Sequence, residues 1–555
     1  MKYQLLGKLL RLLPAAILLG ACTKHPAADT FIKGKIWTGN PKQPWAEAMA
    51  IKGDTLVAVG TGPEVSVWIG DSTNVIALPA GQLITPGFID SHTHFVEGGF
   101  RLSTVQLRDA KTRDEFARRI ADYARTVPAG TWITGGDWDN QNWGGELPER
   151  SWIDAVTPEN PVWLNRLDGH MALANTAALK AAGITDKVQN VPGGAIERKN
   201  GKVTGVFKDN AMGLIESAVP PPTEQQADKA LDAAMRYVSS KGVTSVHNMS
   251  GNWGAFQRAH QQSRMITRIY AGTAIDNWRE LVEKIKKDGR GDTWLRFGNV
   301  KQFVDGSLGS HTAAFFKPFA DSPTDSGFYL TPPVILYRQI KSADSAGLHL
   351  MVHAIGDKGI RTLLDIFERV QKENGARDRR FRIEHLQHIH PGDIARVSAL
   401  GIIGSMQPYH AIDDGRFAEK YIGYERCKTT YAFKSLIDAR ATLAFGSDWF
   451  VAPPTPLEGI YAAVTRRTLD DKNPDGWVPE QKISVEDALK AYTINGAYAS
   501  FEDDIKGSLV PGKLADFVIL DKDITTIDPV EIRNVKVLRT IVGGRVVYLP
   551  ALENL

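Results

Sequence analysis

The stretch that decides the fold of this chain is Thr85-Pro86-Gly87-Phe88-Ile89-Asp90-Ser91-His92-Thr93-His94. It joins an apolar run to two histidines, and residues two positions apart on a strand face the same side. Functional side chains of a parallel α/β barrel gather at the carboxyl ends of its strands. Because neutral imidazoles bind zinc and similar metals, His92 and His94 are predicted to open a metal site.

The centre of the sequence alternates apolar strands with helix-like stretches, which indicates an α/β fold with a (β/α)8 TIM-like barrel. Eight strands are predicted, at residues 83–89, 244–247, 267–271, 300–304, 348–353, 382–385, 402–406 and 442–446. The first two are separated by far more residues than one strand–helix unit needs. An insertion at about residues 100–235 is therefore predicted to form a subdomain or lid after barrel strand 1.

The inserted region is rich in tryptophan. These residues are Trp132, Trp138, Trp143, Trp152 and Trp163. They would build either an aromatic substrate pocket or the insertion's own core, and we favour the core.

Both ends of the chain consist of short β-prone pieces broken by Gly and Pro. Residues 22–82 and 500–555 are therefore predicted to form one composite β-sandwich domain, with the barrel domain at residues 83–499 between them. The length of 555 residues suits a large barrel with such an accessory domain.

The start of the chain has the features of an export signal. Its apolar run, residues 12–19, is too short to cross a bilayer as a helix. The tetrapeptide Leu19-Gly20-Ala21-Cys22 resembles a bacterial lipobox, which implies that residues 1–21 are a lipoprotein signal peptide and that Cys22 carries lipid. We expect an exported bacterial lipoprotein, membrane-anchored at the periplasmic or outer face. An uncleaved anchor and a plain secretory signal are the alternatives.

The positive net charge belongs to this signal. Lys2, Lys8 and Arg11 lie in it, no acidic residue does, and the formal charge of the whole chain is +3. The mature chain is then close to neutral, and nothing in it indicates nucleic-acid binding. With Cys22 lipidated, Cys427 is the only free cysteine, so no intramolecular disulfide can form. We interpret Cys427 as a buried thiol and not as a nucleophile.

Polar residues also end four of the later predicted strands. They are Lys301, His353, His385 and Asp448. Each has an ordinary interpretation alone: a lysine that reaches solvent, a histidine bonded within the core, or an aspartate that caps the next helix. Their joint occurrence at strand ends, in phase with the histidine pair, indicates one shared site.

This set resembles the ligand set of the amidohydrolase superfamily. Four further stretches resemble amidohydrolase family 3, the YtcJ-like group that includes N-substituted formamide deformylase, and the likeness extends over about residues 30–548. The stretches are Asp168-Gly169-His170-Met171-Ala172-Leu173-Ala174-Asn175-Thr176-Ala177-Ala178-Leu179, Thr204-Gly205-Val206, Asp305-Gly306-Ser307-Leu308-Gly309-Ser310 and His353-Ala354-Ile355-Gly356-Asp357.

The resemblance implies a metal-dependent hydrolase that cleaves a non-peptide C–N bond of amide, N-formyl or N-acyl type. It implies two divalent ions, with zinc as the default. His92 and His94 would bind one ion with Asp448 as a further ligand, and His353 and His385 would bind the second. Lys301 matches a position where related enzymes carry an N-carboxylated lysine that bridges the ions; an unmodified lysine beside carboxylates is the alternative.

The implied mechanism uses metal-bound hydroxide as the nucleophile and Asp448 as the proton shuttle to the leaving nitrogen. His170 is the first candidate for holding a small amide-like substrate, and His311 is a weaker one; for both, a structural role is equally open. Glu384 is predicted to support the ligands or the fold. The sequence does not distinguish a monomer from an oligomer.

Three alternative functions compete with this interpretation. A mononuclear deaminase of the same superfamily needs no lysine bridge, and Lys301 argues against it. A catalytically inactive lipid-anchored binding protein should have lost ligands, yet all six positions are filled. A Ser-His-Asp hydrolase is disfavoured because the sequence has no Gly-x-Ser-x-Gly elbow.

Overall fold

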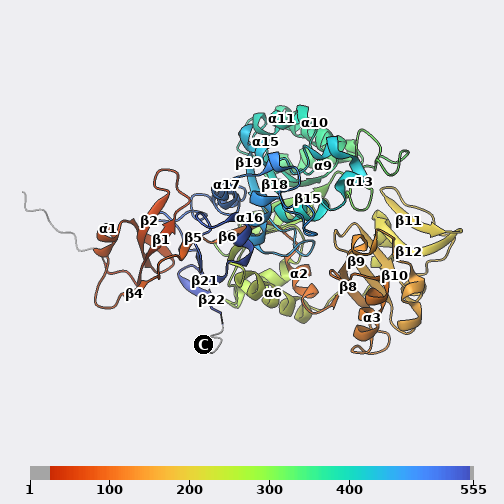
Figure 1. Ribbon diagram of the computed structural model, residues 1–555, viewed down its shortest axis with the longest axis horizontal. Helices are drawn as coiled ribbons and strands as arrows, with labels where there is room; N and C mark the ends of the chain where they lie inside the picture. Colours follow the sequence, from red (N-terminus) through yellow and green to blue (C-terminus); the bar gives the residue numbers. More distant parts are fainter. Residues whose placement is uncertain (1–25, 551–555) are drawn as a thin grey trace, which may run out of the picture.

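The computed structural model describes residues 26–550, which fold into a central barrel, a sheet built from both chain ends and an inserted subdomain (Figure 1). Within this range no helix is long and apolar enough to span a membrane. Cys22 and residues 1–21 lie outside the described residues, so the signal peptide, the lipidation and the location of the protein stay predictions.

The central barrel is confirmed, with all eight predicted strands. They are β6 (Phe88–Thr93), β13 (Val243–Asn248), β14 (Arg268–Ala274), β15 (Leu295–Phe303), β16 (His349–Ala354), β17 (Arg382–His385), β18 (Ile403–Met406) and β19 (Thr442–Phe445). Neighbours are parallel and follow chain order. The chain after β19 returns to β6, where the Asp448 N–H donates to the His92 carbonyl at 2.7 Å and the His94 N–H to the Trp449 carbonyl at 2.6 Å.

Amphipathic helices follow the strands and cover the barrel, and α10 (Asp357–Asn374) shows why they form. Its buried residues recur at the spacing of one helix face and are Ile360, Leu363, Leu364, Phe367 and Val370. The helix ends at Gly375, whose φ of +78° favours glycine. Burial of this face against the strands holds each strand end, and hence each polar side chain there, in place.

The first predicted strand, residues 83–89, is two strands in the structure. β5 (Leu83–Pro86) pairs with β1 (Thr30–Trp37) and with β20 (Phe517–Leu520) in the terminal sheet, whereas β6 starts the barrel. The break falls at Gly87, where a Cβ would lie only 2.2 Å from the Thr244 side chain. The apolar run at residues 83–89 therefore contributes one strand to the terminal sheet and one to the barrel.

The two chain ends contribute strands to one sheet, where the sequence predicted a β-sandwich. Its other strands are β2 (Trp45–Lys52), β3 (Thr55–Gly60), β4 (Asn74–Ala77), β21 (Val537–Val542) and β22 (Arg545–Tyr548). They form a single hydrogen-bonded sheet with the order β22-β21-β20-β5-β1-β2-β3, and β4 pairs with β1. The sheet is continuous because β5 bonds the N-terminal strands on one side and the C-terminal strands on the other.

The insertion forms its own six-stranded sheet, on the right in Figure 1. In sheet order its strands are β11 (Gly194–Lys199), β12 (Lys202–Asp209), β10 (Met171–Ala174), β9 (Val162–Arg166), β8 (Ile133–Trp138) and β7 (Val105–Gln106). Its five tryptophans pack in or against two apolar clusters separate from the barrel core, which confirms the core interpretation. The insertion is shorter than the predicted 100–235, because α6 (Glu224–Ser239) buries its apolar face in the barrel core.

Candidate metal centre

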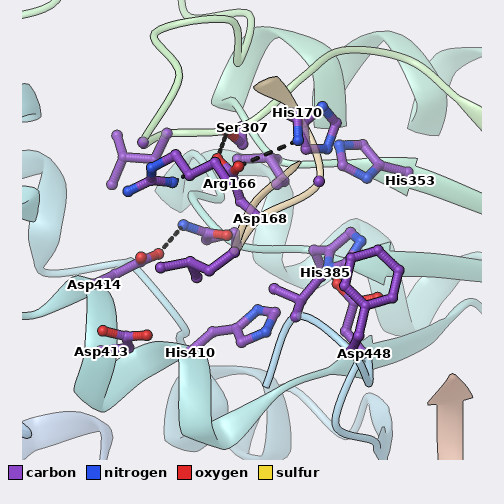
Figure 2. Close-up of a pocket in the computed structure, with 18 of the residues that line it drawn as sticks. Arg166, Asp168, His170, Ser307, His353, His385, His410, Asp413, Asp414 and Asp448 are labelled. Atoms are coloured by element: carbon purple, nitrogen blue, oxygen red, sulfur yellow. Dashed lines mark hydrogen bonds and ion pairs between the residues drawn. The ribbon is translucent and has the colours of Figure 1, made fainter. Parts of the chain in front are cut away.

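The six predicted ligands meet at the carboxyl ends of the barrel strands. They are His92 and His94 at the end of β6, Lys301 on β15, His353 on β16, His385 on β17 and Asp448 after β19. All except His92 line one cavity of about 170 Å³, and His92 is fully buried behind it. Figure 2 shows His353, His385 and Asp448 together on one side of this cavity.

The side chains of His92 and His94 both point to one carboxylate oxygen of Asp448. Nε2 of His92 lies 3.3 Å and Nε2 of His94 lies 3.4 Å from Oδ1 of Asp448. Burial and the neighbouring Lys301 lower the pKa of His92 to about 4. Its imidazole is therefore neutral at neutral pH, which is the state that binds a metal.

Partners behind the pair fix the orientation of both rings. Nδ1 of His92 is 2.6 Å from Oε2 of Glu384, and Nδ1 of His94 is 2.8 Å from the Ser250 hydroxyl. Burial would raise the pKa of Glu384, but Arg382, paired with it at 2.8 Å, and His92 hold that pKa well below its ordinary value. A carboxylate that holds the far nitrogen of a ligand histidine is a common support of metal sites. Glu384 therefore orients His92, one of the predicted ligands.

Lys301 is buried next to these ligands. Its Nζ lies 3.1 Å from Nε2 of His92. Burial lowers the pKa of Lys301 to about 8, although the carboxylates of Asp448 and Glu384 act in the opposite direction. The amine is thus far more easily deprotonated than that of a surface lysine.

His353 and His385 lie side by side, with ring centroids 4.5 Å apart. Nε2 of His353 is 3.1 Å from the carbonyl of Gly306, and Nδ1 of His385 is 2.8 Å from Oε1 of Gln407. These acceptors take an N–H from each ring, which leaves Nδ1 of His353 and Nε2 of His385 with the lone pair that a metal needs.

Asp448 is the common neighbour of the group. Burial would raise its pKa, but His92, His94 and His385 hold that pKa well below its ordinary value. Its Oδ1 is buried and has no hydrogen-bond partner, which is costly for a polar atom. His385 and Asp448 also have left-handed backbones, with φ of 72° and 60°, a strain that concentrates at functional sites. The orphaned oxygen and the surrounding nitrogens suit a divalent cation.

Three of the four family-like stretches meet at the edge of this site. His170, in the loop between β9 and β10, places Nδ1 2.6 Å from Oδ1 of Asp209. Asp168 in the same loop accepts a hydrogen bond from Ser307 at 2.7 Å (Figure 2). It also accepts one from Ser310 at 3.1 Å. The carboxylate of Asp305 accepts from the N–H groups of the loop that follows β16. His170 thereby lines the cavity, its ring 5.1 Å from that of His353.

The fourth stretch, Thr204-Gly205-Val206, lies on β12 away from the cavity lining. Gly205 has a φ of +108°, and a Cβ there would lie 2.4 Å from the Ala174 carbonyl. This stretch therefore packs the insertion sheet.

The structure places His311 elsewhere. Its Nε2 lies 3.0 Å from Asp321, its ring packs on Phe319 and Tyr421, and it is not among the residues that line the cavity. Cys427 is buried, as predicted, and burial raises the pKa of its thiol to about 12.

One residue of the site escaped the sequence analysis. His410 lines the cavity, and its Nε2 is buried without a hydrogen-bond partner. Its position in the sequence could have indicated it, because it follows β18 by four residues. Among the last five barrel strands, β18 alone has no predicted ligand on it or just after it.

Comparison with known proteins decides the family. The model of the amidohydrolase family matches residues 79–548. The chain belongs to this family. LONG AFTER FAR-RED 3 from Arabidopsis thaliana is 41% identical to it over 94% of this chain and 92% of that protein. N-substituted formamide deformylase from Arthrobacter pascens is 28% identical over 93% and 97% of the two chains.

A solved structure has the same architecture. The amidohydrolase described here superposes on an uncharacterized metal-dependent hydrolase from Pyrococcus horikoshii ot3 with a TM-score of 0.73 and 27% identity, over 90% of this chain and 99% of that one. The family and the cluster of histidines and aspartate identify a metal-dependent hydrolase of the amidohydrolase superfamily that uses a divalent metal.

Proposed function

We propose that this amidohydrolase cleaves a non-peptide C–N bond of a small amide, N-formyl or N-acyl compound with two divalent ions, zinc in the simplest case. The observation that carries the proposal is the buried Oδ1 of Asp448, which makes no hydrogen bond and has the Nε2 atoms of His92 and His94 at 3.3 and 3.4 Å. The adjacent pair His353 and His385 supports a second ion. Nitrogen and oxygen ligands in this mixture suit zinc.

The metal supplies two things when bound: a strong nucleophile at neutral pH, since it lowers the pKa of water, and polarisation of the carbonyl. The chain's own residues hold the ions and handle the proton. Asp448 faces both histidine pairs, with Oδ1 toward His92 and His94 and Oδ2 4.0 Å from Nδ1 of His385. From there it would accept the proton of the attacking water and return it to the leaving nitrogen.

We propose that Lys301 is N-carboxylated. A cationic ammonium 3.1 Å from a ligand nitrogen of His92 would repel metal ions. A neutral amine adds to CO2 with loss of one proton, and the carbamate that results carries one negative charge shared by two oxygens. The burial of Lys301, which favours its neutral form, supports this modification.

The substrate proposal rests on the cavity and on one relative. A cavity of about 170 Å³ suits a small molecule. His170 at its edge is tied to Asp209 through Nδ1, so its Nε2 side can hold the carbonyl oxygen or another polar group of the substrate. The relative named N-substituted formamide deformylase supports the amide class.

The test is a hydrolysis screen combined with metal counting. Purified chain, reconstituted with zinc and bicarbonate, is assayed on N-formyl amines, N-acyl amino acids, carbamates and cyclic amides. We expect two equivalents of metal and release of an amine from at least one class. One tightly bound equivalent with deaminase activity would replace the proposal by the mononuclear alternative, and inertness on the whole panel would indicate a protein without catalysis.

We also propose that lipid on Cys22 anchors the protein to a membrane, on the strength of the sequence Leu19-Gly20-Ala21-Cys22. Cells that express the full chain are fed a labelled fatty acid. Label should appear in the wild-type protein and be absent from Cys22→Ser, whereas equal labelling of the two would reject the anchor.

A further inference from the structure

His410 stands at the cavity wall on a short, fixed connection. It follows β18 through Gln407, Pro408 and Tyr409, within α12 (Pro408–Asp414), and its N–H donates to the Gln407 carbonyl at 3.1 Å. Its ring lies parallel to that of His385, with an interplanar angle of 10° and centroids 6.3 Å apart. Figure 2 shows the ring of His410 below His385 and beside Asp448.

Two buried polar atoms of these residues make no hydrogen bond. Nε2 of His410 and Oδ1 of Asp448 are both buried and make no hydrogen bond. A buried polar atom that makes no hydrogen bond is costly, so a second such atom beside the site indicates a missing ligand. No ion pair joins His410 to Asp448 within 4.0 Å, and a direct hydrogen bond therefore does not account for the two atoms.

The geometry of three residues matches a metal site. One ligand atom each from His385, His410 and Asp448 lies within 4.8 Å of the other two, and the same holds for His92, His94 and Asp448. Gln407 links two members of the first group, because its side chain accepts from Nδ1 of His385 and its backbone carbonyl from the N–H of His410.

We propose that His410 is a metal ligand, which joins His353, His385 and Asp448 in holding the second divalent ion of the centre. Asp448 is then shared by both ions, since it belongs to both groups of three. This inference rests on the proposed two-metal function and adds to it a histidine from α12, the helix that follows the seventh barrel strand. The cation that fits is a transition metal such as zinc, because imidazoles and a carboxylate are the donors.

The test counts metal in the full-length protein after zinc reconstitution and removal of free ions. Wild type should hold two equivalents, and His410→Ala and the size-matched His410→Gln should hold about one. His410→Asp, which restores a ligand atom, should recover part of the second. His390→Ala is the control: His390 is exposed, bonds the Gly392 N–H, and should leave the count at two. Cobalt substitution gives a second readout, since loss of a ligand changes the visible absorption of the bound ion.

Each other outcome is decisive. If His410→Ala and His410→Gln melt near the wild-type temperature and keep two equivalents while KM alone rises, His410 contacts the substrate and the inference is overturned. A wild type with one equivalent would instead reject the two-metal function. In that case, loss of the single ion from His410→Ala but not from His92→Ala would uphold His410 as a ligand, and retention of the ion would reject it.

Discussion

The barrel and the insertion bury their side chains in opposite ways. Where the barrel strands end, they bury charged and imidazole groups such as His92, Glu384 and Asp448, all of which are almost fully covered. The insertion buries a conventional apolar core, with Phe116, Trp138 and Trp152 in one cluster. It contributes to the cavity only through the loop between β9 and β10, from Arg166 to His170.

This difference separates two tasks. A barrel has a rigid, closed ring of strand ends. Polar groups are costly to bury there, but neighbouring side chains stabilise them. The insertion needs only to fold stably beside this ring and to contribute one loop to the cavity wall. Changes in the barrel wall should therefore alter metal binding, whereas changes in the insertion should alter stability or substrate contact.

The largest effect is expected from His92→Ala. The variant loses a ligand nitrogen 3.3 Å from Oδ1 of Asp448, so the first ion should leave and activity should fall by more than about 10³-fold. Metal analysis and steady-state kinetics on the same preparation measure both. Full activity with unchanged metal would contradict a metal centre at this position.

A comparably large effect, but on stability alone, is expected from Phe116→Ala. Phe116 is fully buried in the insertion against Trp143 and Trp152, and its truncation should cost about 3–5 kcal/mol of unfolding free energy. Chemical denaturation measures the loss, and metal content in the folded enzyme should be unchanged. Loss of metal at full folding would show that the two regions are not separate.

His170→Ala should reduce kcat by about 10²-fold, because a donor at the cavity edge is removed. The two metal equivalents should remain, since His170 bonds Asp209 in the insertion. Kinetics with parallel metal counts distinguish this from a ligand. As a matched control, His311→Ala should leave kcat near the wild-type value, because His311 pairs with Asp321 outside the cavity lining.

Glu384→Gln should weaken metal affinity by about 10–100-fold without abolishing binding. The variant keeps a hydrogen-bonding side chain of similar size 2.6 Å from Nδ1 of His92 but loses the charge that orients the ring. Competition with a chelator measures the affinity. An affinity equal to that of wild type would assign Glu384 a purely structural role beside Arg382.

Local sequence was enough to predict the strands of the barrel and six residues of its site. Strand ends can be read from apolar runs that stop at a polar residue, and His92, Lys301 and Asp448 all follow such runs. His311 and His410 show the limit. Both histidines lie in segments near the mouth of the barrel, and the sequence does not distinguish their roles. In the structure His311 pairs with Asp321, whereas Nε2 of His410 makes no hydrogen bond.

The sequence by itself determined the class of this protein: a barrel whose strand ends carry candidate metal ligands in a family-typical order. The division of residues 83–93 between two sheets, the early end of the insertion at α6 and the place of His410 were decided by tertiary structure. The physical reason is the range of the interactions. Periodicity and motif spacing act between residues close in the chain, whereas strand pairing, closure of the barrel and unpartnered buried atoms depend on segments hundreds of positions apart.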